Sequence, residues 1–141
     1  MPKVSVIIPT YNRAAYVKEA IDSVLGQSYE DYEIIVVDDG SSDDTNAVVK
    51  GFGDSRIRYI YQKNKGISGA RNTGIRNARA QFVALLDSDD IWFPQILELE
   101  VPILDQNPDL CLVYSKAHAM DQEDNPLPQI QGLAERYEGS C

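Results

Sequence analysis

Five short apolar runs, separated by segments of a different pattern, constrain the fold of this chain more than any other feature. They cover residues 4–8, 33–37, 57–61, 82–86 and 110–114. Runs of about five residues that are rich in β-branched side chains favour buried strands over helices. Polar or acidic residues directly follow the runs at residues 4–8, 33–37 and 82–86.

The segments between these runs place apolar residues at helical spacing. Asn12 can cap the first predicted helix, and Gly26 lies near its end. The predicted helices cover residues 13–27, residues 41–50 with acids in the first turn, residues 66–80 where a glycine-rich loop runs into a helix, and residues 95–106 with a kink at Pro102. Strands that alternate with helices predict an α/β fold, with a mainly parallel sheet flanked by helices.

The length of 141 residues suits one domain. No apolar run approaches the roughly 20 residues that cross a bilayer, and the N-terminus lacks the core of a signal peptide. Cys111 and Cys141 do not make a disulfide framework, and Cys111 is expected to be a small buried hydrophobe. We therefore expect a cytoplasmic protein.

The formal net charge is −9, from 13 basic and 22 acidic side chains. This balance argues against binding to nucleic acid, or to an anionic membrane, through the overall field. The charge is uneven, because residues 61–80 carry five basic and no acidic side chains. A solvated helix face explains Arg76 and Arg79 as well as any functional role does.

Two acidic clusters follow predicted strands. Asp87 and Asp89 are two residues apart and point the same way from a strand end, which suits a hard divalent cation. A helix N-cap is the alternative for Asp89. Asp39 could accept hydrogen bonds from a base or ribose, although Asp39 and Gly40 also form a common turn pair. Strand ends in a parallel sheet converge on one crevice.

Three further features bear on function. Tyr11, just past the first strand, could stack on a nucleobase or pack against the protein. Residues 66–74 open a helix whose N-terminus could bind an anion beside Arg71, but close helix–sheet packing explains the small residues equally well. His118 is the sole histidine, and no hydrolytic triad or zinc-ligand spacing is present.

Taken in order, these motifs resemble family-2 glycosyltransferases of the GT-A fold, which are Rossmann-like. The matching stretches are residues 4–12, 21–28, 33–43, 69–72 and 85–90. The resemblance implies that residues 1–115 form the nucleotide-sugar-binding portion of a GT-A domain. It also implies that residues 116–141 begin an acceptor-side portion that is truncated, so that the domain is incomplete.

The resemblance also implies roles for individual residues. Pro9, Thr10 and Tyr11 would line the nucleoside pocket, with Tyr11 stacked on the base. Asp39 would accept a hydrogen bond from the base, with uracil N3–H as the expected donor, and Asp38 would support that loop.

A second group of residues would bind the diphosphate and a metal ion. Asp89 would be the principal ligand of Mn²⁺ or Mg²⁺. Asp87 would lie near the ribose or reach the metal through water, and Arg71 would contact the diphosphate or the ribose.

The implied reaction moves a sugar from a nucleotide-diphosphate donor, with UDP expected, to a hydroxyl of a saccharide or lipid-linked acceptor, with inversion. The setting would be cell-surface polysaccharide synthesis at the inner face of the membrane. The family's catalytic base lies later in the domain, and neither Glu135 nor Glu138 has the expected surroundings. We therefore expect the base beyond residue 141, and a fragment that binds the donor without transferring the sugar.

Other functions fit parts of the pattern. A sugar-phosphate nucleotidyltransferase would need a glycine-rich basic loop after the first strand, where residues 10–15 have no glycine. A phosphoacceptor domain would need an aspartate after the third strand, which ends at Tyr61 and Gln62. A non-catalytic nucleotide-binding or oligomerisation fragment is the non-enzyme alternative, and an exposed sheet edge would favour a homodimer.

Overall fold

The computed structural model describes residues 1–121. Its elements are β1 (Val4–Thr10), α1 (Ala14–Leu25), β2 (Tyr32–Asp38), α2 (Thr45–Gly51), β3 (Ile57–Tyr61), α3 (Gly66–Asn77), β4 (Phe82–Leu85) and α4 (Ile96–Gln106). The chain divides into two compact units, Met1–Gln95 and a second that begins at Ile96 with α4. The predictions for Glu135, Glu138 and Cys141 lie outside the described residues.

The four strands form one sheet in the order β3-β2-β1-β4, and every neighbouring pair is parallel. At the centre of the sheet, Ile7 of β1 lies in register between Ile35 of β2 and Leu85 of β4. β1 and β2 are buried along their whole length, as expected for parallel strands that are covered on both faces. The predicted α/β fold with a mainly parallel sheet is confirmed.

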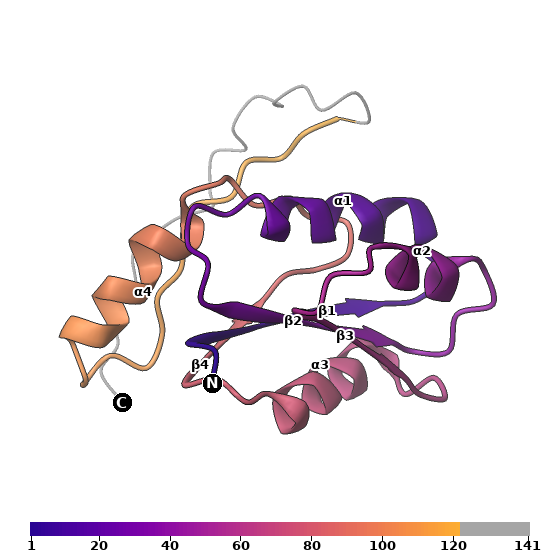
Figure 1. Ribbon diagram of the computed structural model, residues 1–141, viewed down its shortest axis with the longest axis horizontal. Coiled ribbons are helices and arrows are strands. Elements are labelled where there is room, and N and C mark those ends of the chain that lie inside the picture. Colours follow the sequence, from indigo (N-terminus) through magenta and orange to yellow (C-terminus); the bar gives the residue numbers. More distant parts are fainter. Residues whose placement is uncertain (122–141) are drawn as a thin grey trace. The chain divides into compact units, whose positions relative to one another are not determined.

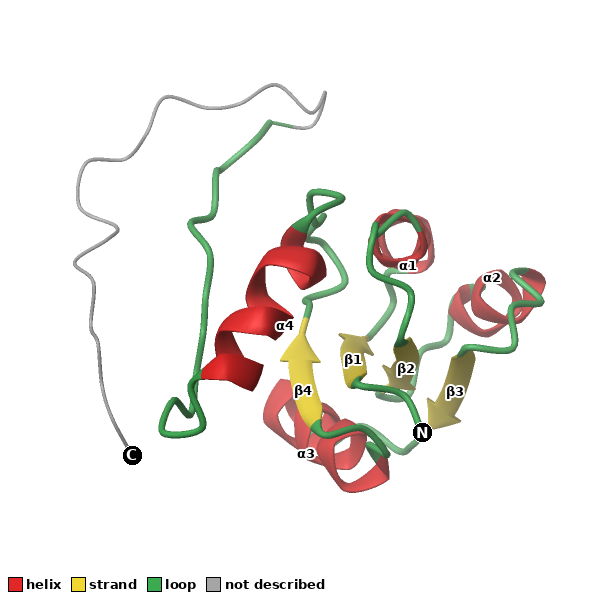
Figure 2. Cartoon of the chain, turned by 60° about the vertical axis from the view of Figure 1, so that its left-hand side comes forward, coloured by secondary structure: helices red, strands yellow, loops and turns green. Residues whose placement is uncertain are grey.

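Helices cover both faces of this sheet. α1 and α2 lie on one face and α3 lies on the other (Figures 1 and 2). On the α3 face, Ala70 packs in a cluster with Ile7, Ile35 and Val37. The face of α1 that is buried consists of Val17, Ala20, Ile21 and Val24.

Gly74 brings α3 unusually close to the sheet. A Cβ added to Gly74 would overlap the side chain of Ile7 at the centre of β1. Close helix–sheet packing, one of the two interpretations of the glycine-rich segment, therefore explains Gly74. The helix begins at Gly66 itself, so the loop predicted at the start of this segment is wrong.

The start of α1 differs from the prediction. Asn12 does not cap the helix; it has a positive φ of 51° and its Oδ1 accepts a hydrogen bond from the Ser42 amide at 2.8 Å. The carboxylate of Asp43 takes the capping role, because its Oδ2 accepts from the Ala14 amide at 3.0 Å. Asp43 precedes α2, whose first turn holds no acid, so one loop carboxylate stabilises the N-terminus of a different helix.

The second unit confirms one prediction and overturns two. α4 forms as expected and contains Pro102. The strand predicted at residues 110–114 is wrong, since only Leu110 in that range forms a bridge. Cys111 is exposed rather than buried. An apolar run becomes a strand only where a neighbouring backbone continues the ladder, and the residues that the structure describes do not extend the bridge at Leu110. Within residues 1–121, no helix is long and apolar enough to cross a bilayer.

Candidate functional site

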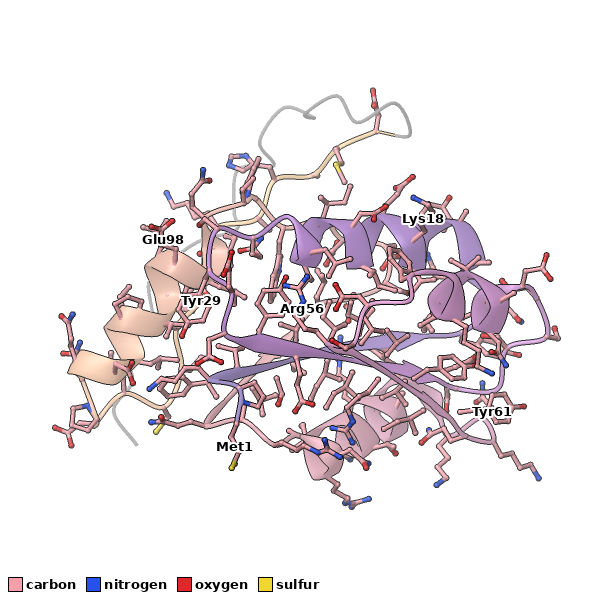
Figure 3. The ribbon with its side chains drawn as sticks, viewed as in Figure 1. Met1, Lys18, Tyr29, Arg56, Tyr61 and Glu98 are labelled. Carbon is pink, nitrogen blue, oxygen red and sulfur yellow. The ribbon has the colours of Figure 1, made fainter. Side chains whose placement is uncertain are left out.

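A pocket of about 420 Å³ lies at the carboxyl ends of the strands. Figure 3 shows this edge at the Tyr61 end of the sheet, opposite Met1. The chain runs from β1 to β2 and β3 on one side, and returns to place β4 on the other side of β1. The crevice beside β1 is therefore the topological switch point, where open α/β sheets bind ligands. The pocket is lined by Pro9, Thr10, Tyr11, Arg13, Asp39, Asn64, Gly66, Ile67, Ala70, Asp87, Ser88 and Asp89.

Six of the eight predicted site residues meet in this pocket. They come from three chain segments and are Pro9, Thr10, Tyr11, Asp39, Asp87 and Asp89. The Tyr11 side chain is half exposed, which leaves its ring accessible. Thr10 is buried, and its Oγ1 has no hydrogen-bond partner among the described residues. The roles expected of these residues stay predictions.

Asp39 is held in place by three hydrogen bonds. Its amide donates to the Thr10 carbonyl at 2.9 Å, which joins the ends of β1 and β2. Its Oδ1 accepts from Gln62 Nε2 at 2.6 Å and from the Lys65 amide at 2.9 Å. Asp39 is buried, with 3% of its surface exposed, and it lines the pocket.

Asp38 is buried and does not line the pocket. Its buried carboxylate accepts from the Ser41 amide at 2.7 Å and from the Tyr59 hydroxyl. Burial and the hydrogen bond to Asp38 raise the pKa of Tyr59, so that the phenol stays a neutral donor. These contacts fix the loop between Asp38 and Ser41.

Arginines hold both carboxylates of the Asp87–Asp89 pair. Arg71 Nη2 lies 2.6 and 2.9 Å from the two carboxylate oxygens of Asp87. Arg71 belongs to α3 and does not line the pocket. Arg13, which does line it, places Nη1 2.8 Å from Asp89 Oδ2.

Negative charge is concentrated after β4. Burial raises the pKa of Asp90, and repulsion from the charges of Asp89 and Asp87 raises it further. The described residues bring no three His, Cys, Asp or Glu side chains together as a complete metal site. A magnesium-like cation is commonly held by one or two carboxylates together with substrate phosphates and water. The carboxylates of Asp87 and Asp89 fit that kind of ion.

The family model described as glycosyl transferase family 2 matches residues 5–138. The chain belongs to glycosyltransferase family 2. This match favours a glycosyltransferase over the nucleotidyltransferase and phosphoacceptor alternatives. Similar structures are GT-A glycosyltransferases, so the GT-A form of the predicted fold is confirmed.

Two curated relatives illustrate the family. An uncharacterized glycosyltransferase of Rickettsia prowazekii is 42% identical over 128 residues, which are 89% of this chain and 40% of that protein. The UDP-Glc:α-D-GlcNAc-diphosphoundecaprenol β-1,3-glucosyltransferase WfgD of Escherichia coli is 44% identical over 105 residues, which are 74% of this chain and 42% of that protein. The chain therefore spans less than half the length of these relatives.

Two solved structures with bound donors are similar. S. aureus TarS 1-349 in complex with UDP-GlcNAc has a TM-score of 0.71 and 31% identity, covering 75% of this chain and 32% of that one. The mannosyltransferase PcManGT from Pyrobaculum calidifontis, in complex with GDP-Man and Mn²⁺, has a TM-score of 0.68 and 31% identity, covering 73% and 32%.

Sequence reasoning missed several residues of this candidate site. Arg13, Asn64 and Ser88 line the pocket, and Gln62 holds Asp39 from outside it. Ser88 lies between Asp87 and Asp89, within the acidic cluster that follows β4. Asn64 and Gln62 lie within the basic stretch at residues 61–80, but no sequence motif marks either of them as a site residue.

Proposed function

We propose that this chain forms the donor-binding part of an inverting, metal-dependent glycosyltransferase. The enzyme would transfer a sugar from a nucleotide-diphosphate donor, with UDP as the nucleotide, to a hydroxyl of a saccharide or lipid-linked acceptor. The observation that carries this proposal is the meeting of Tyr11, Asp39 and the Asp87–Asp89 pair in one pocket at the switch point of the sheet.

The nucleoside would bind between Tyr11 and Asp39. The half-exposed Tyr11 ring offers a stacking surface, and the Asp39 carboxylate accepts but does not donate hydrogen bonds. Uracil carries a ring N–H that could donate to Asp39. The names of the WfgD relative and of the TarS complex, which both include a UDP-sugar, support uridine as the first choice.

The diphosphate would lie between the acidic pair and the N-terminus of α3. Asp89 and Asp87 would hold Mn²⁺ or Mg²⁺, and the Mn²⁺ in the PcManGT complex supports a divalent ion. When bound, the ion would offset the charge of the nucleotide diphosphate leaving group. Gly66 and Ile67 line the pocket at the start of α3, where the helix dipole favours an anion.

We assign the role of catalytic base to no described side chain. Inversion requires a single displacement in which a base deprotonates the acceptor hydroxyl. We propose that the base comes from residues beyond 141, so that residues 1–141 bind the donor without transferring the sugar. The diphosphoundecaprenol acceptor in the name of WfgD supports a lipid-linked acceptor. We propose that the enzyme works in cell-surface polysaccharide synthesis at the cytoplasmic face of the membrane.

Calorimetric titration of UDP in the presence of Mn²⁺ tests the proposal through two variants. Asp39→Ala should lose the base contact and Asp89→Ala the metal contact, and each should weaken UDP binding at least about tenfold. Asp44→Ala is the matched control, because Asp44 is exposed and its side chain makes no capping hydrogen bond at the N-cap position of α2. Unaltered UDP affinity in both site variants would refute the assignment.

A further inference from the structure

We propose that Gln62 is a positioning residue that fixes the Asp39 carboxylate and thereby sets the preference of the pocket for a nucleobase with a ring N–H. This inference rests on the proposed function, since it concerns how the same pocket distinguishes one nucleotide from another. Gln62 belongs to none of the sequence motifs and does not line the pocket.

Gln62 joins three parts of the fold. It follows β3 directly, and its amide donates to the Asp38 carbonyl at 2.9 Å. Its Nε2 donates to Asp39 Oδ1 at 2.6 Å, and its Oε1 accepts from Thr73 Oγ1 of α3, also at 2.6 Å. The side chain therefore links α3 to the carboxylate at the end of β2.

The chemistry of the partners fixes the direction of this chain of hydrogen bonds. A carboxylate can only accept, so the NH₂ group of Gln62 faces Asp39 and its carbonyl faces Thr73. The hydroxyl of Thr73 has one proton and lies closer to Gln62 Oε1 than to the Gly69 carbonyl, at 2.6 Å against 3.1 Å. Thr73 therefore donates to Gln62, and Gln62 donates to Asp39.

Two donors on Oδ1 leave the other oxygen of Asp39 for a ligand. The side-chain Nε2 of Gln62 and the backbone N–H of Lys65 both donate to Oδ1, and no described residue donates to Oδ2. Asp39 lines the pocket, and a carboxylate held in one orientation would keep Oδ2 as a fixed acceptor for a ligand there. Such preorganisation strengthens the matching contact and penalises a mismatched one.

Uracil and cytosine differ at the position that this acceptor would read. Uracil has an N–H at ring position 3, whereas neutral cytosine has an acceptor nitrogen there. UDP and CDP share the ribose and the diphosphate, so the ratio of their affinities isolates the base contact from the phosphate and metal contacts. The ratio would also separate positioning of Asp39 from a general loss of fold.

The experiment measures binding of UDP and of CDP to residues 1–141 in Mn²⁺ by calorimetry, for the wild type and for Gln62→Met. We expect UDP affinity to fall about tenfold, because Asp39 loses the contact that fixes its carboxylate for the base, while CDP affinity changes less than about twofold. Gln81→Met is the matched control, since exposed Gln81 accepts from Lys3 just before β4 at the other end of the sheet. It should leave both affinities unchanged.

Thr73→Val provides a second route to the same answer. This change removes the hydroxyl that holds Gln62 but leaves the contact of Gln62 with Asp39, so the ratio of UDP to CDP affinity should fall in the same direction by a smaller factor. Thermal unfolding followed by circular dichroism shows which variants fold. If Gln62→Met does not fold, the ratio in Thr73→Val decides.

The outcomes separate this inference from the proposed function. If the wild type does not bind UDP, both fail. If UDP binds and Asp39→Ala weakens it, but Gln62→Met leaves the ratio of UDP to CDP affinity unchanged or lowers both affinities equally, the positioning role is overturned and the proposed function stands.

Discussion

Arg13 Nη1 lies 2.8 Å from Asp89 Oδ2, so the arginine that follows β1 forms an ion pair with the carboxylate that we propose as the main metal ligand. Both side chains are nearly half exposed, at 45% and 46%. A divalent cation at Asp89 would therefore compete with the Arg13 guanidinium, whose attraction to Asp89 is weakened by the surrounding water. Exposed pairs of this kind contribute about 0.2–1 kcal/mol, so the competition should be measurable but modest.

Arg13→Ala should therefore strengthen Mn²⁺ binding in the absence of nucleotide, by about 1.4-fold to fivefold. Electron paramagnetic resonance of free Mn²⁺ measures this affinity directly. Lys18→Ala is the matched control, because Lys18 forms a similarly exposed pair with Asp22 on α1 and removes the same charge. Weaker Mn²⁺ binding in Arg13→Ala, or an equal gain in Lys18→Ala, would contradict a competition at Asp89.

Arg71 and Asp87 should behave as one unit. Removing the guanidinium in Arg71→Met leaves the Asp87 carboxylate without its two short contacts and beside the charge of Asp89. We expect Arg71→Met and Asp87→Asn each to weaken UDP binding in Mn²⁺ about tenfold. The double variant should be little worse than either single change, because contacting residues are not additive. Fully additive losses would show that the pair does not act jointly.

Gly74→Ala should destabilise the fold because its new methyl group overlaps Ile7. Overpacking of this kind costs about 1–3 kcal/mol in the free energy of unfolding, which urea denaturation measures. Gly51→Ala is the control, since a Cβ there meets nothing within 4 Å and alanine favours the helix. Equal stability of the two variants would mean that α3 does not lie against β1 as described.

Glu33 should make the fold sensitive to acid. Burial opposes its charge, but hydrogen bonds from Ser5, Arg58 and the Arg79 amide outweigh that penalty and lower the pKa of Glu33. A lowered pKa stabilises the fold above the unfolded pKa, near 4.5, and this contribution is lost as the pH falls toward the folded pKa.

Urea unfolding at pH 7 and pH 4 tests this through Glu33→Gln. The variant should be less stable than the wild type at pH 7, and the gap should narrow at pH 4 as the wild type loses the carboxylate contribution. Glu19→Gln on α1 serves as the surface control. A gap that stays constant with pH would exclude Glu33 as the titrating group.

Local patterns were enough to predict four strands, their parallel arrangement and six of the twelve residues that line the pocket. Thr10, Asp39 and Asp87 lie within two residues of the ends of buried runs, and the carboxyl ends of parallel strands lie at one edge of the sheet. The sequence could not reveal that Gln62 meets Thr73 or that Asp43 caps α1, because these contacts join segments whose spacing carries no periodic signal. The strand predicted at residues 110–114 is wrong because an apolar pattern does not show whether a neighbouring strand is present to pair with it.

The central claim is that the pocket holds a nucleotide diphosphate with the help of a divalent cation. Titration of residues 1–141 with UDP, once with Mn²⁺ and once with EDTA, tests it most directly. We predict clear binding with Mn²⁺ and an affinity at least about tenfold lower in EDTA, because the acids after β4 repel an unscreened diphosphate. Equal UDP affinity in both conditions, or no binding in either, would contradict the claim.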